Sequence, residues 1–486
     1  MNPRTAVAHT LVACGLFAGL VAQDLQKRLP NIVYVLADDL GYGDLGCYGQ
    51  QQIRTPHLDA MARDGMRFVQ HYSGAPVCAP SRCVLLTGKH SGHATIRDNQ
   101  EHQPEGQKPI APDDVTLAEV LKARGYVTGC FGKWGLGYPG SDGDPRRRGF
   151  DRFYGYNCQR HAHNYYPTYL WDDDERRELV GNSNGATGAH YSADVITDAA
   201  VAFVEANAAR PFFLYVPMTL PHLALQVPEA SLAAYRGQWE ETPYTGTSYQ
   251  PHPTPRACYA AMVTHLDALV GRLLGALDQQ GLREHTIVFF SSDNGPTHLP
   301  AQVDVEFFGS AGGLRGLKGS VDEGGIRVPL LVRWPLQVAA GSRTDHVCAF
   351  QDVMPTLCEV AGAATPLATD GISFVPTLRG AVAQQRQHEA LLWDFPGYGG
   401  QLAVREGKWK GVRRKLRQHP GAPLELYDLE ADRAETTDVA AANAEVVARL
   451  LARMVAMRTE PVDAALRFGD YATGAVKTDA AERAGR

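Results

Sequence analysis

The sequence predicts an α/β fold in which a large mixed, mostly parallel sheet is flanked by helices. Three apolar runs lead to this prediction: "NIVYVLADDLGYGD" (31–44), "PFFLYVPMTLPH" (211–222) and "HTIVFFSSDNGP" (285–296). Each run is rich in β-branched or aromatic residues and ends in polar residues followed by Gly or Pro, which is typical of strands covered on both faces. Helical patterns lie between the runs, so strand and helix alternate along the chain.

Four segments between and around these runs show helical patterns. They cover residues 58–66, 113–125, 191–208 and 256–281. In the last of them apolar residues such as Tyr259, Met262 and Leu266 recur at the spacing of an amphipathic helix. The stretch 228–255 is rich in Pro, Tyr, Thr and Gly without a clear period, and we expect it to be a long loop at the rim of the sheet.

A smaller C-terminal α+β domain with an antiparallel sheet is predicted after residue 375. The runs "HEALLWDF" (388–395), "QLAVREGKWKGVRR" (401–414) and "LELYDLEAD" (424–432) predict short strands joined by tight turns. The run "NAEVVARLLARMVAMR" (443–458) predicts one amphipathic helix. We therefore divide the chain into a signal peptide (1–22), a catalytic domain (23–375) and a C-terminal α+β subdomain (376–486).

Composition and charge limit the classes of partner. The 486 residues are 44% apolar and 21% charged, with a formal net charge of -6. Because there is no overall basic excess, we expect no nucleic-acid partner, and any anion must be bound by a local cluster. The nine cysteines form no CxxC pair, which argues against a thiolate zinc site.

The N-terminus has the pattern of a secretory signal peptide. Arg4 precedes an apolar run that ends in small residues near Ala22. We therefore expect the protein to be exported to the periplasm or the extracellular space. The run "LVAC" (11–14) resembles a bacterial lipoprotein processing box, which makes a lipid anchor through Cys14 an alternative. No later segment is expected to be long and apolar enough to span a membrane.

Acidic and amide side chains follow two of the predicted strands. Asp38 and Asp39 end the first apolar run, and Asp293 and Asn294 end the third. In open α/β sheets ligands bind beyond the carboxyl ends of the strands, so these side chains are expected around one cleft. Their oxygen atoms suit Ca²⁺ or Mg²⁺ rather than zinc. Either pair alone also fits a turn that caps the backbone, whereas both pairs together favour a metal site.

The motif "CAPSRCVLLTG" (78–88) places a cysteine at the start of a helix. Pro80 suits the first turn of a helix, so Cys78 lies where the peptide dipoles favour negative charge. The motif resembles the sulfatase signature C-x-P-S-R-x-x-x-L-T-G, whose cysteine is converted to Cα-formylglycine by a separate maturation enzyme. Similarity extends to "TPHLDAMARDGMRF", "GKWGLG" and "LKGSVDEGGIRVPLLVRWP". The sequence thus resembles type I sulfatases, which implies a fold like that of alkaline phosphatase.

The resemblance implies a sulfuric ester hydrolase with a formylglycine nucleophile. In this family a hydrated formylglycine attacks sulfur with one hydroxyl, the alcohol departs, and the second hydroxyl expels sulfate. The implied metal is Ca²⁺, with Mg²⁺ as the alternative, and it binds the sulfate oxygens and the formylglycine hydrate. The implied metal ligands are Asp38, Asp39, Cys78 in its converted form, Asp293 and Asn294.

The family pattern also implies roles for charged residues outside the metal site. Asp293 is the candidate base for the attacking hydroxyl, and Arg82 is expected to contact the hydrate. Lys133 and Lys318 are expected to hold the sulfate, with Lys318 also assisting the leaving oxygen. His222 is expected to donate the proton. Many sulfatases have a histidine where this chain has Gly135, and His90, His93 and His190 are the candidates to replace it, with His190 favoured.

A carbohydrate sulfate is the expected substrate. The segment "NCQRHAHNYYPTYLW" (157–171) brings His161 and His163 together with aromatic residues, a combination that suits a sugar ring, although a packed loop is the alternative. Arg97 and Asn99 lie in a second candidate rim segment. The run "PHLALQVP" (221–228) resembles a variant found in sulfatases that act on galactose-type sugars.

Three other functions compete with this interpretation. A phosphate or phosphonate ester hydrolase of the same superfamily would use the same metal site and nucleophile. A catalytically silent sulfoglycan-binding protein would explain Gly135 but not the retained Cys78. An acyl-transfer hydrolase with a Cys78 thiolate would leave the two acidic strand ends unexplained.

Overall fold

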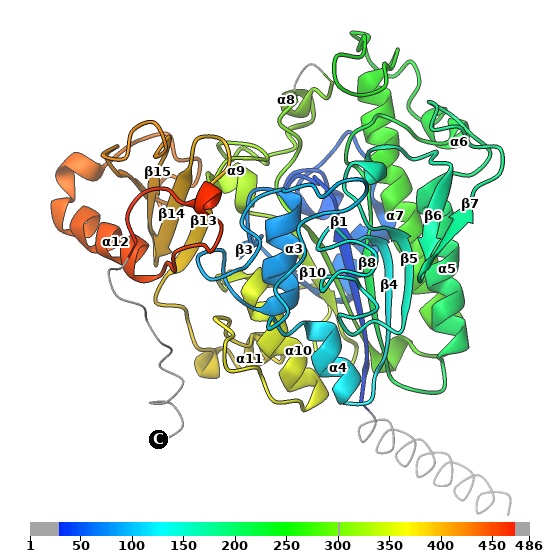
Figure 1. Cartoon of the computed structure of the whole chain (residues 1–486), viewed down its shortest axis with the longest axis horizontal. Helices are drawn as coiled ribbons and strands as arrows, with labels where there is room; N and C mark the ends of the chain where they lie inside the picture. Colours follow the sequence, from blue (N-terminus) through cyan, green and yellow to red (C-terminus); the bar gives the residue numbers. More distant parts are fainter. Residues whose placement is uncertain (1–28, 300–301, 472–486) are drawn as a thin grey trace, which may run out of the picture.

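The computed structural model describes residues 29–299 and 302–471 (Figure 1). The predicted signal peptide (1–22), and Cys14 within it, lie outside the described residues. A ten-stranded sheet forms the centre of the molecule, in the order β11-β2-β10-β9-β1-β8-β4-β5-β6-β7 (Figure 1). Five neighbouring strands run parallel: β9 (Thr286–Ser292), β1 (Asn31–Ala37), β8 (Phe212–Pro217), β4 (Val127–Lys133) and β5 (Arg152–Tyr156).

Shorter strands complete the sheet on both sides. They are β10 (Leu330–Arg333), β2 (Met66–Phe68) and β11 (Ser342–Thr344) on one side, and β6 (Tyr169–Asp172) and β7 (Glu175–Glu178) on the other. Strand β10 is antiparallel to both of its neighbours, and β6 is antiparallel to β5 and β7. The predicted strands at 31–44, 211–222 and 285–296 are β1, β8 and β9, so the predicted mixed sheet is confirmed.

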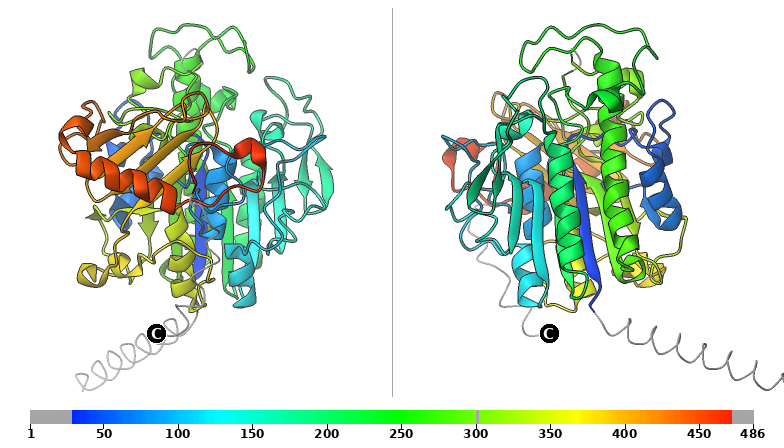
Figure 2. Two further views of the ribbon diagram at one scale, coloured as in Figure 1. Left: turned by 60° about the vertical axis from the view of Figure 1, so that its left-hand side comes forward. Right: turned by 90° about the vertical axis from the view of Figure 1, so that its right-hand side faces the viewer.

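Both faces of the sheet are covered, so its central strands β1, β8 and β9 are buried at every position and are mostly apolar. In β1, Val33 and Val35 pack into one hydrophobic core, and Ile32 and Tyr34 pack into the other. The helices of the first face are α2 (Pro56–Asp64), α5 (Ser192–Ala206) and α7 (Pro255–Gln279). Those of the second are α3 (Cys78–Thr87), α4 (Leu117–Ala123) and α10 (Val353–Ala361). Figure 2 shows α5 and α7, in green, side by side on the first face.

Helix α7 corrects the expectation that no segment after the N-terminus is long and apolar enough to span a membrane. By length and composition it could cross a membrane, and it is the one such helix among the described residues. Most of it is buried, and Leu266, Leu269 and Leu273 belong to the core beneath the sheet. It is therefore a core helix. The predicted rim loop that precedes it contains α6 (Glu229–Leu232) and otherwise irregular chain.

The C-terminal part has its own antiparallel sheet. Strands β13 (Leu391–Phe395), β14 (Gln401–Glu406), β15 (Trp409–Arg413) and β16 (Glu425–Asp428) pair in sequence order. Helix α12 (Ala444–Ala456) covers one face through Leu450 and Met454. Trp393, on the other face, packs with Tyr72 and Ile326 of the catalytic part. The domain boundary at residue 375 stays a prediction.

A buried ion cluster connects this small sheet to the catalytic part. The Lys410 ammonium lies 2.9 Å from a carboxylate oxygen of Glu323 and 2.9 Å from one of Glu435, and all three side chains are fully buried. Glu323 begins α9 (Glu323–Ile326), the helix that follows the loop carrying Lys318. The cluster therefore helps to hold that loop in place.

Candidate active site

The carboxyl ends of β1 and β9 bring the predicted oxygen ligands together. Asp38 and Asp39 follow β1, and Asp293 and Asn294 follow its parallel neighbour β9. The Asp39 backbone N–H donates to Asp293 at 3.2 Å, and the Asn294 amide donates to Asp39 at 2.8 Å. All four residues are buried. Asp39 has a φ of 60°, in the left-handed region, so the backbone turns sharply here to aim both aspartates at one point.

Cys78 begins α3 and faces this carboxylate cluster. Its Sγ lies 3.5 Å from Asp38 Oδ1. Val77, the residue before the helix, is extended, so the first turn of α3 points at the cluster. Burial, followed by the nearby Asp38 carboxylate, raises the pKa of the Cys78 thiol to about 12. The unmodified side chain is therefore a protonated thiol.

Three buried cations surround the carboxylates. Arg82, one turn along α3, donates to Asp293 Oδ2 at 2.8 Å and 3.1 Å. Lys133, the last residue of β4, lies 2.6 Å from Asp38 and 3.7 Å from Cys78 Sγ. Lys318 lies 2.8 Å from Asp39. The cluster thus contains three acidic and three basic side chains that compensate one another, of which Lys318 is the most exposed, with 9% of its side chain accessible.

The same charges set the pKa values of the acids. Burial alone would raise the pKa of Asp38, but the charges of Lys133 and Arg82 outweigh it and hold that pKa well below its ordinary value. Burial and repulsion from Asp38 raise the pKa of Asp293 to about 6, although Arg82 opposes the shift. Without a bound cation, the pKa of Asp38 is therefore lowered and that of Asp293 is raised.

The residues present fit a hard divalent cation. The amide of Asn294 donates to Asp39 and to the Gly295 carbonyl, whereas its Oδ1 is buried without a hydrogen-bond partner. A buried carbonyl oxygen without a partner is costly, and a cation would satisfy it. Atoms of Asp38, Asp39, Cys78 and His222 that could bind a metal lie within 4.8 Å of one another. The oxygen-rich donor set suits Ca²⁺ or Mg²⁺.

His222 follows β8 at the edge of the cluster. Its Nδ1 faces the Leu223 carbonyl, which accepts a hydrogen bond from it, and its Nε2 lies 3.6 Å from Asp39. The carbonyl fixes the proton of the neutral ring on Nδ1, so Nε2 presents a lone pair to the cluster. Burial, Lys318 and Lys133 lower the pKa of His222 well below its ordinary value. The ring is therefore neutral at pH 7.

Two rings cover His222 from the outside. His163 stacks on it with ring centroids 4.6 Å apart, and Tyr249 meets it edge-on at 6.2 Å. The sequence predicted His163 as a substrate-binding residue. It did not identify Tyr249, because this residue lies in a loop that has no helical or strand periodicity. Both rings also line a cavity of about 480 Å³, and we infer that this cavity is the entrance to the cluster.

Comparisons with known proteins agree with this geometry. The family model "Sulfatase" matches residues 30–363, and the model "N-sulphoglucosamine sulphohydrolase, C-terminal" matches residues 318–460. Arylsulfatase A of Homo sapiens is 32% identical over 514 residues, which cover 93% of this chain and 92% of that protein. The chain belongs to the sulfatase family. It is a type I sulfatase of the alkaline-phosphatase superfamily and a sulfuric ester hydrolase, so the resemblance stated from the motifs is confirmed.

Two further similar proteins are described with a sugar. N-acetylgalactosamine-6-sulfatase of Canis lupus familiaris is 33% identical over 374 residues, which cover 74% of this chain and 67% of that protein. The solved structure of Ps i-CgsB in complex with k-i-k-neocarrahexaose has a TM-score of 0.76 and 27% identity, and the match covers 90% of this chain and 94% of the other.

The structure separates the four residues predicted to bind substrate in this sulfatase. His163 lies at the entrance, and His161 lines a cavity nearby. Asn99 accepts a hydrogen bond at 3.0 Å from the backbone N–H of Ala79, next to Cys78. Arg97 is buried away from this entrance, and its guanidinium binds Asp394 at 3.0 Å and Thr459 at 3.0 Å. Arg97 is therefore not placed to touch substrate, contrary to the prediction from the sequence. Its contacts with Asp394 and Thr459 instead join this segment to the C-terminal part of the chain.

The candidates to replace the histidine absent at Gly135 do not lie at the cluster. His93 lies 3.0 Å from Asp370 and its ring stacks on His90, in the loop beyond the C-terminal end of α3. His190 is exposed, and its backbone pairs with Asn182. His163 is the further histidine that the structure places beside His222.

Gly135 is required by its backbone conformation. Its φ is +79°, and a Cβ there would lie 3.4 Å from the side chain of Gln159. We expect Gly135→His to cost about 1–2 kcal/mol of unfolding free energy, because a left-handed conformation penalises any residue with a Cβ. We also expect no gain in sulfate release. Urea denaturation and a sulfate assay check both expectations, and a more active variant of unchanged stability would contradict them.

Proposed function

We propose that this sulfatase removes sulfate from a sulfated carbohydrate, with Cys78 converted to Cα-formylglycine by a maturation enzyme. The observation that carries the proposal is the position of Cys78 at the start of α3, 3.5 Å from Asp38 and beside three buried cations. The carbohydrate substrate is supported by the aromatic and polar entrance formed by His163 and Tyr249, and by the two similar proteins described with a sugar. The run 221–228 favours a galactose-type sugar.

The proposal assigns the metal ligands to the strand ends. Asp38, Asp39, Asp293 and Asn294 would hold Ca²⁺ or Mg²⁺, which neutralises charge on the sulfate oxygens. Formylglycine at position 78 would supply a hydroxyl nucleophile in its hydrated form. Asp293, whose pKa is raised to about 6, would accept the proton of that hydroxyl.

The buried cations would bind the sulfate. Lys133 lies beside Cys78 Sγ, and Lys318 lies on the side of Asp39, so the two ammonium groups flank the space in front of residue 78. Arg82 donates to Asp293 and lies 3.4 Å from Asp38, which holds both carboxylates in position. Preorganised positive charge of this kind stabilises a transition state in which charge builds up on the sulfuryl oxygens.

Lys318 is the better candidate for the proton donor. Its pKa is raised well above its ordinary value, since the carboxylates of Asp39 and Asp38 outweigh burial, and so the ammonium keeps its proton. His222 is neutral and presents a lone pair at Nε2. We therefore transfer the role of donor from His222 to Lys318, and assign to His222 a hydrogen bond that orients the ammonium or the leaving group.

A leaving-group test checks this assignment. We expect Lys318→Ala to lower the kcat for a sugar sulfate by roughly 10²- to 10⁴-fold, because a sugar alkoxide needs a proton as it departs. The loss for a nitrophenyl sulfate is expected to be smaller, because a nitrophenolate leaves without one. Equal losses on both substrates would assign Lys318 to sulfate binding alone.

Removal of the metal is expected to change both the activity and the thermal stability of the protein. We expect a chelator to lower sulfate release by more than roughly tenfold, and Ca²⁺ or Mg²⁺ to restore it. The thermal unfolding midpoint should also rise when the cation is added back, because an ion that binds the folded state alone stabilises it by about 2.7 kcal/mol at one hundred times its Kd. Asn294→Ala should weaken this shift. Full activity and an unchanged midpoint after chelation would contradict the metal site.

The competing mechanisms are less well supported. A thiolate hydrolase would need Cys78 ionised near pH 7, whereas its pKa is raised to about 12, which leaves on the order of one thiolate in 10⁵. A screen for sulfate release from defined sulfated mono- and oligosaccharides, with aryl sulfate and aryl phosphate in parallel, tests the proposed reaction. Preferred turnover of the phosphate, or sugar binding without sulfate release, would contradict it.

We further propose that the protein is exported to the periplasm or the extracellular space. The proposal is supported by the charged and apolar pattern of residues 1–22, with a lipid anchor at Cys14 as the alternative form. N-terminal sequencing of the protein from its native host tests it. A chain that begins at Met1 in the cytoplasm would contradict it.

A further inference from the structure

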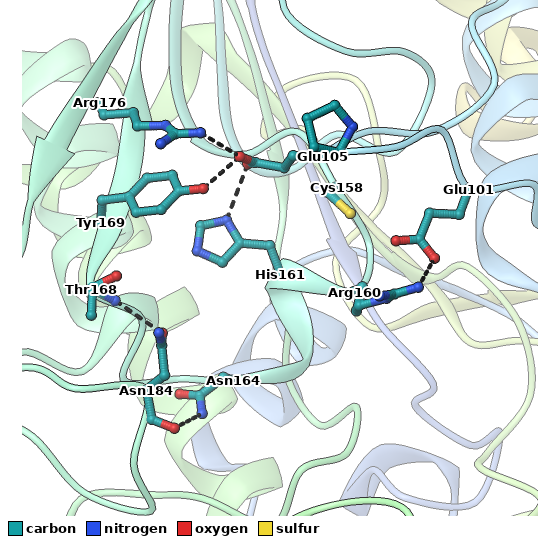
Figure 3. A pocket seen from close by; sticks show the side chains of 11 residues that line it. Glu101, Glu105, Cys158, Arg160, His161, Asn164, Thr168, Tyr169, Arg176 and Asn184 are labelled. Carbon is teal, nitrogen blue, oxygen red and sulfur yellow. Dashed lines mark hydrogen bonds and ion pairs between the residues drawn. The ribbon is translucent and has the colours of Figure 1, made fainter.

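A cavity of about 410 Å³ lies beside the segment that contains His161 (Figure 3). Its walls come from parts of the chain that are far apart in sequence, including Glu101, Glu105, Tyr169 and Arg176. Figure 3 shows Tyr169, His161 and Arg176 arranged around the Glu105 carboxylate. The mechanism described above uses none of these side chains.

A second cavity lies next to this one, beside the rings that cover His222. It has a volume of about 480 Å³ and shares Arg160 and Asn164 with the first. Its other side is formed by His163 and Tyr249, the two rings that cover His222. The two cavities are therefore neighbours, and the second one borders the rings that cover His222.

The charges of the first cavity are balanced. Arg160 pairs with Glu101, and Arg176 donates to Glu105 at 3.2 Å. Glu105 also accepts from Tyr169 and, at 2.7 Å, from Trp171. Burial would raise the pKa of Glu105, but His161, whose Nδ1 lies 3.4 Å away, and the hydrogen bonds from Tyr169 and Trp171 lower it to about 2, so it is a carboxylate. Every arginine of this cavity faces a carboxylate, which leaves no arginine unpaired for a second sulfate.

The lining suits a ring that carries hydroxyl groups. His161 and Tyr169 are in ring contact, with centroids 4.5 Å apart, and offer an apolar surface. Paired carboxylates and guanidinium groups beside such a surface accept and donate hydrogen bonds to hydroxyls. A fully paired set of charges discriminates against an anionic group, because binding it would require breaking an ion pair.

We propose that the cavity around Glu105 and Tyr169 binds an uncharged sugar unit of the same chain whose sulfated unit occupies the catalytic cluster. This proposal rests on the proposed function and extends it from a sulfated sugar to a sulfated oligosaccharide. The connecting units of the chain lie along Arg160 and Asn164. Arg160 is thus a specificity-determining residue, because it lines both cavities.

The test compares three substrates of the metal-loaded, formylglycine-bearing protein. They are a nitrophenyl sulfate, a monosulfated galactose or N-acetylgalactosamine, and an oligosaccharide that carries the same sulfated unit next to unsulfated ones. We expect kcat/KM for the oligosaccharide to exceed that for the monosaccharide by roughly tenfold or more. Arg160→Ala and Glu105→Gln should each reduce this advantage by roughly tenfold, the usual effect of losing one charge-assisted hydrogen bond.

Two features of the design keep the result unambiguous. The Arg160 side chain is 68% exposed and has Glu101 as its ion-pair partner, so its truncation is expected to leave the fold intact. Arg177→Ala is the matched control, because Arg177 lies on β7 next to Arg176, is exposed and lines neither cavity. It should leave all three kcat/KM values unchanged.

Each outcome decides between the two proposals. Equal kcat/KM for monosaccharide and oligosaccharide would overturn the distal sugar site and leave the proposed function standing. If kcat/KM fell equally for the oligosaccharide and the nitrophenyl sulfate in both variants, the distal sugar site would also be overturned. Hydrolysis of the nitrophenyl sulfate without that of any sugar would overturn both proposals.

Discussion

Cys78→Ala is expected to lower sulfate release by on the order of 10⁴-fold or more, because it removes the side chain from which the nucleophile is made. Cys78 is the one cysteine of the described residues that lies against the carboxylate cluster, and no other described cysteine is placed to replace it. Alanine keeps the start of α3 and creates little empty space. We therefore expect unchanged circular dichroism and a thermal midpoint within a few degrees of the wild type.

Cys83→Ala is the matched control for this variant. Cys83 lies on the same helix and is also fully buried, but its side chain packs into the core beneath the sheet. We expect it to lose about 1 kcal/mol of unfolding free energy and to keep its activity. If Cys78→Ala kept more than a few per cent of wild-type turnover, the assigned nucleophile would be wrong.

Lys410→Met is expected to lower the free energy of unfolding by about 3–5 kcal/mol, because it removes the cation that lies between two buried acidic side chains. Lys410 is fully buried between Glu323 and Glu435. With the ammonium in place, the pKa of Glu323 is lowered to about 2 despite its burial. Methionine fills a similar volume, so the loss in unfolding free energy reports the missing charge rather than a cavity. Urea denaturation at pH 7 measures this loss.

Lys408→Met is the matched control for this prediction. Lys408 lies two positions earlier, is 40% exposed and pairs with Asp428 at the surface. An exposed, solvent-screened pair contributes little to stability, so the control should unfold close to the wild type. We also expect Lys410→Met to lose activity, since α9 and the loop of Lys318 are joined to this cluster. Equal stability of the two variants would contradict the role of the cluster.

The central sheet could be predicted because its strands are apolar on both faces. Runs such as those of β1 and β9 cannot be half-exposed, and a parallel arrangement brings their polar ends to one edge. The same argument places Asp38 and Asn294 in one site from the order of residues alone. The shorter strands β2 and β11 have three residues each and carry no such signal.

The errors in the site come from contacts between distant parts of the sequence. Arg97 was expected at the rim because its segment is polar, but its partner Asp394 lies 297 positions away and draws it into the interior. Tyr249 reaches His222 from a loop without periodicity. The protonation of His222 depends on the Leu223 carbonyl and on Lys318, whose positions the local sequence does not reveal.

Mass spectrometry of residue 78 in the active protein tests the central claim most directly. Trypsin should release the peptide Phe68–Arg82, in which Cys78 is the single cysteine. The account predicts an aldehyde at this position, detected as a peptide that reacts with a hydroxylamine probe and not with a thiol alkylating agent, in proportion to specific activity. Fully active protein whose Phe68–Arg82 peptide carried an alkylated thiol would contradict it.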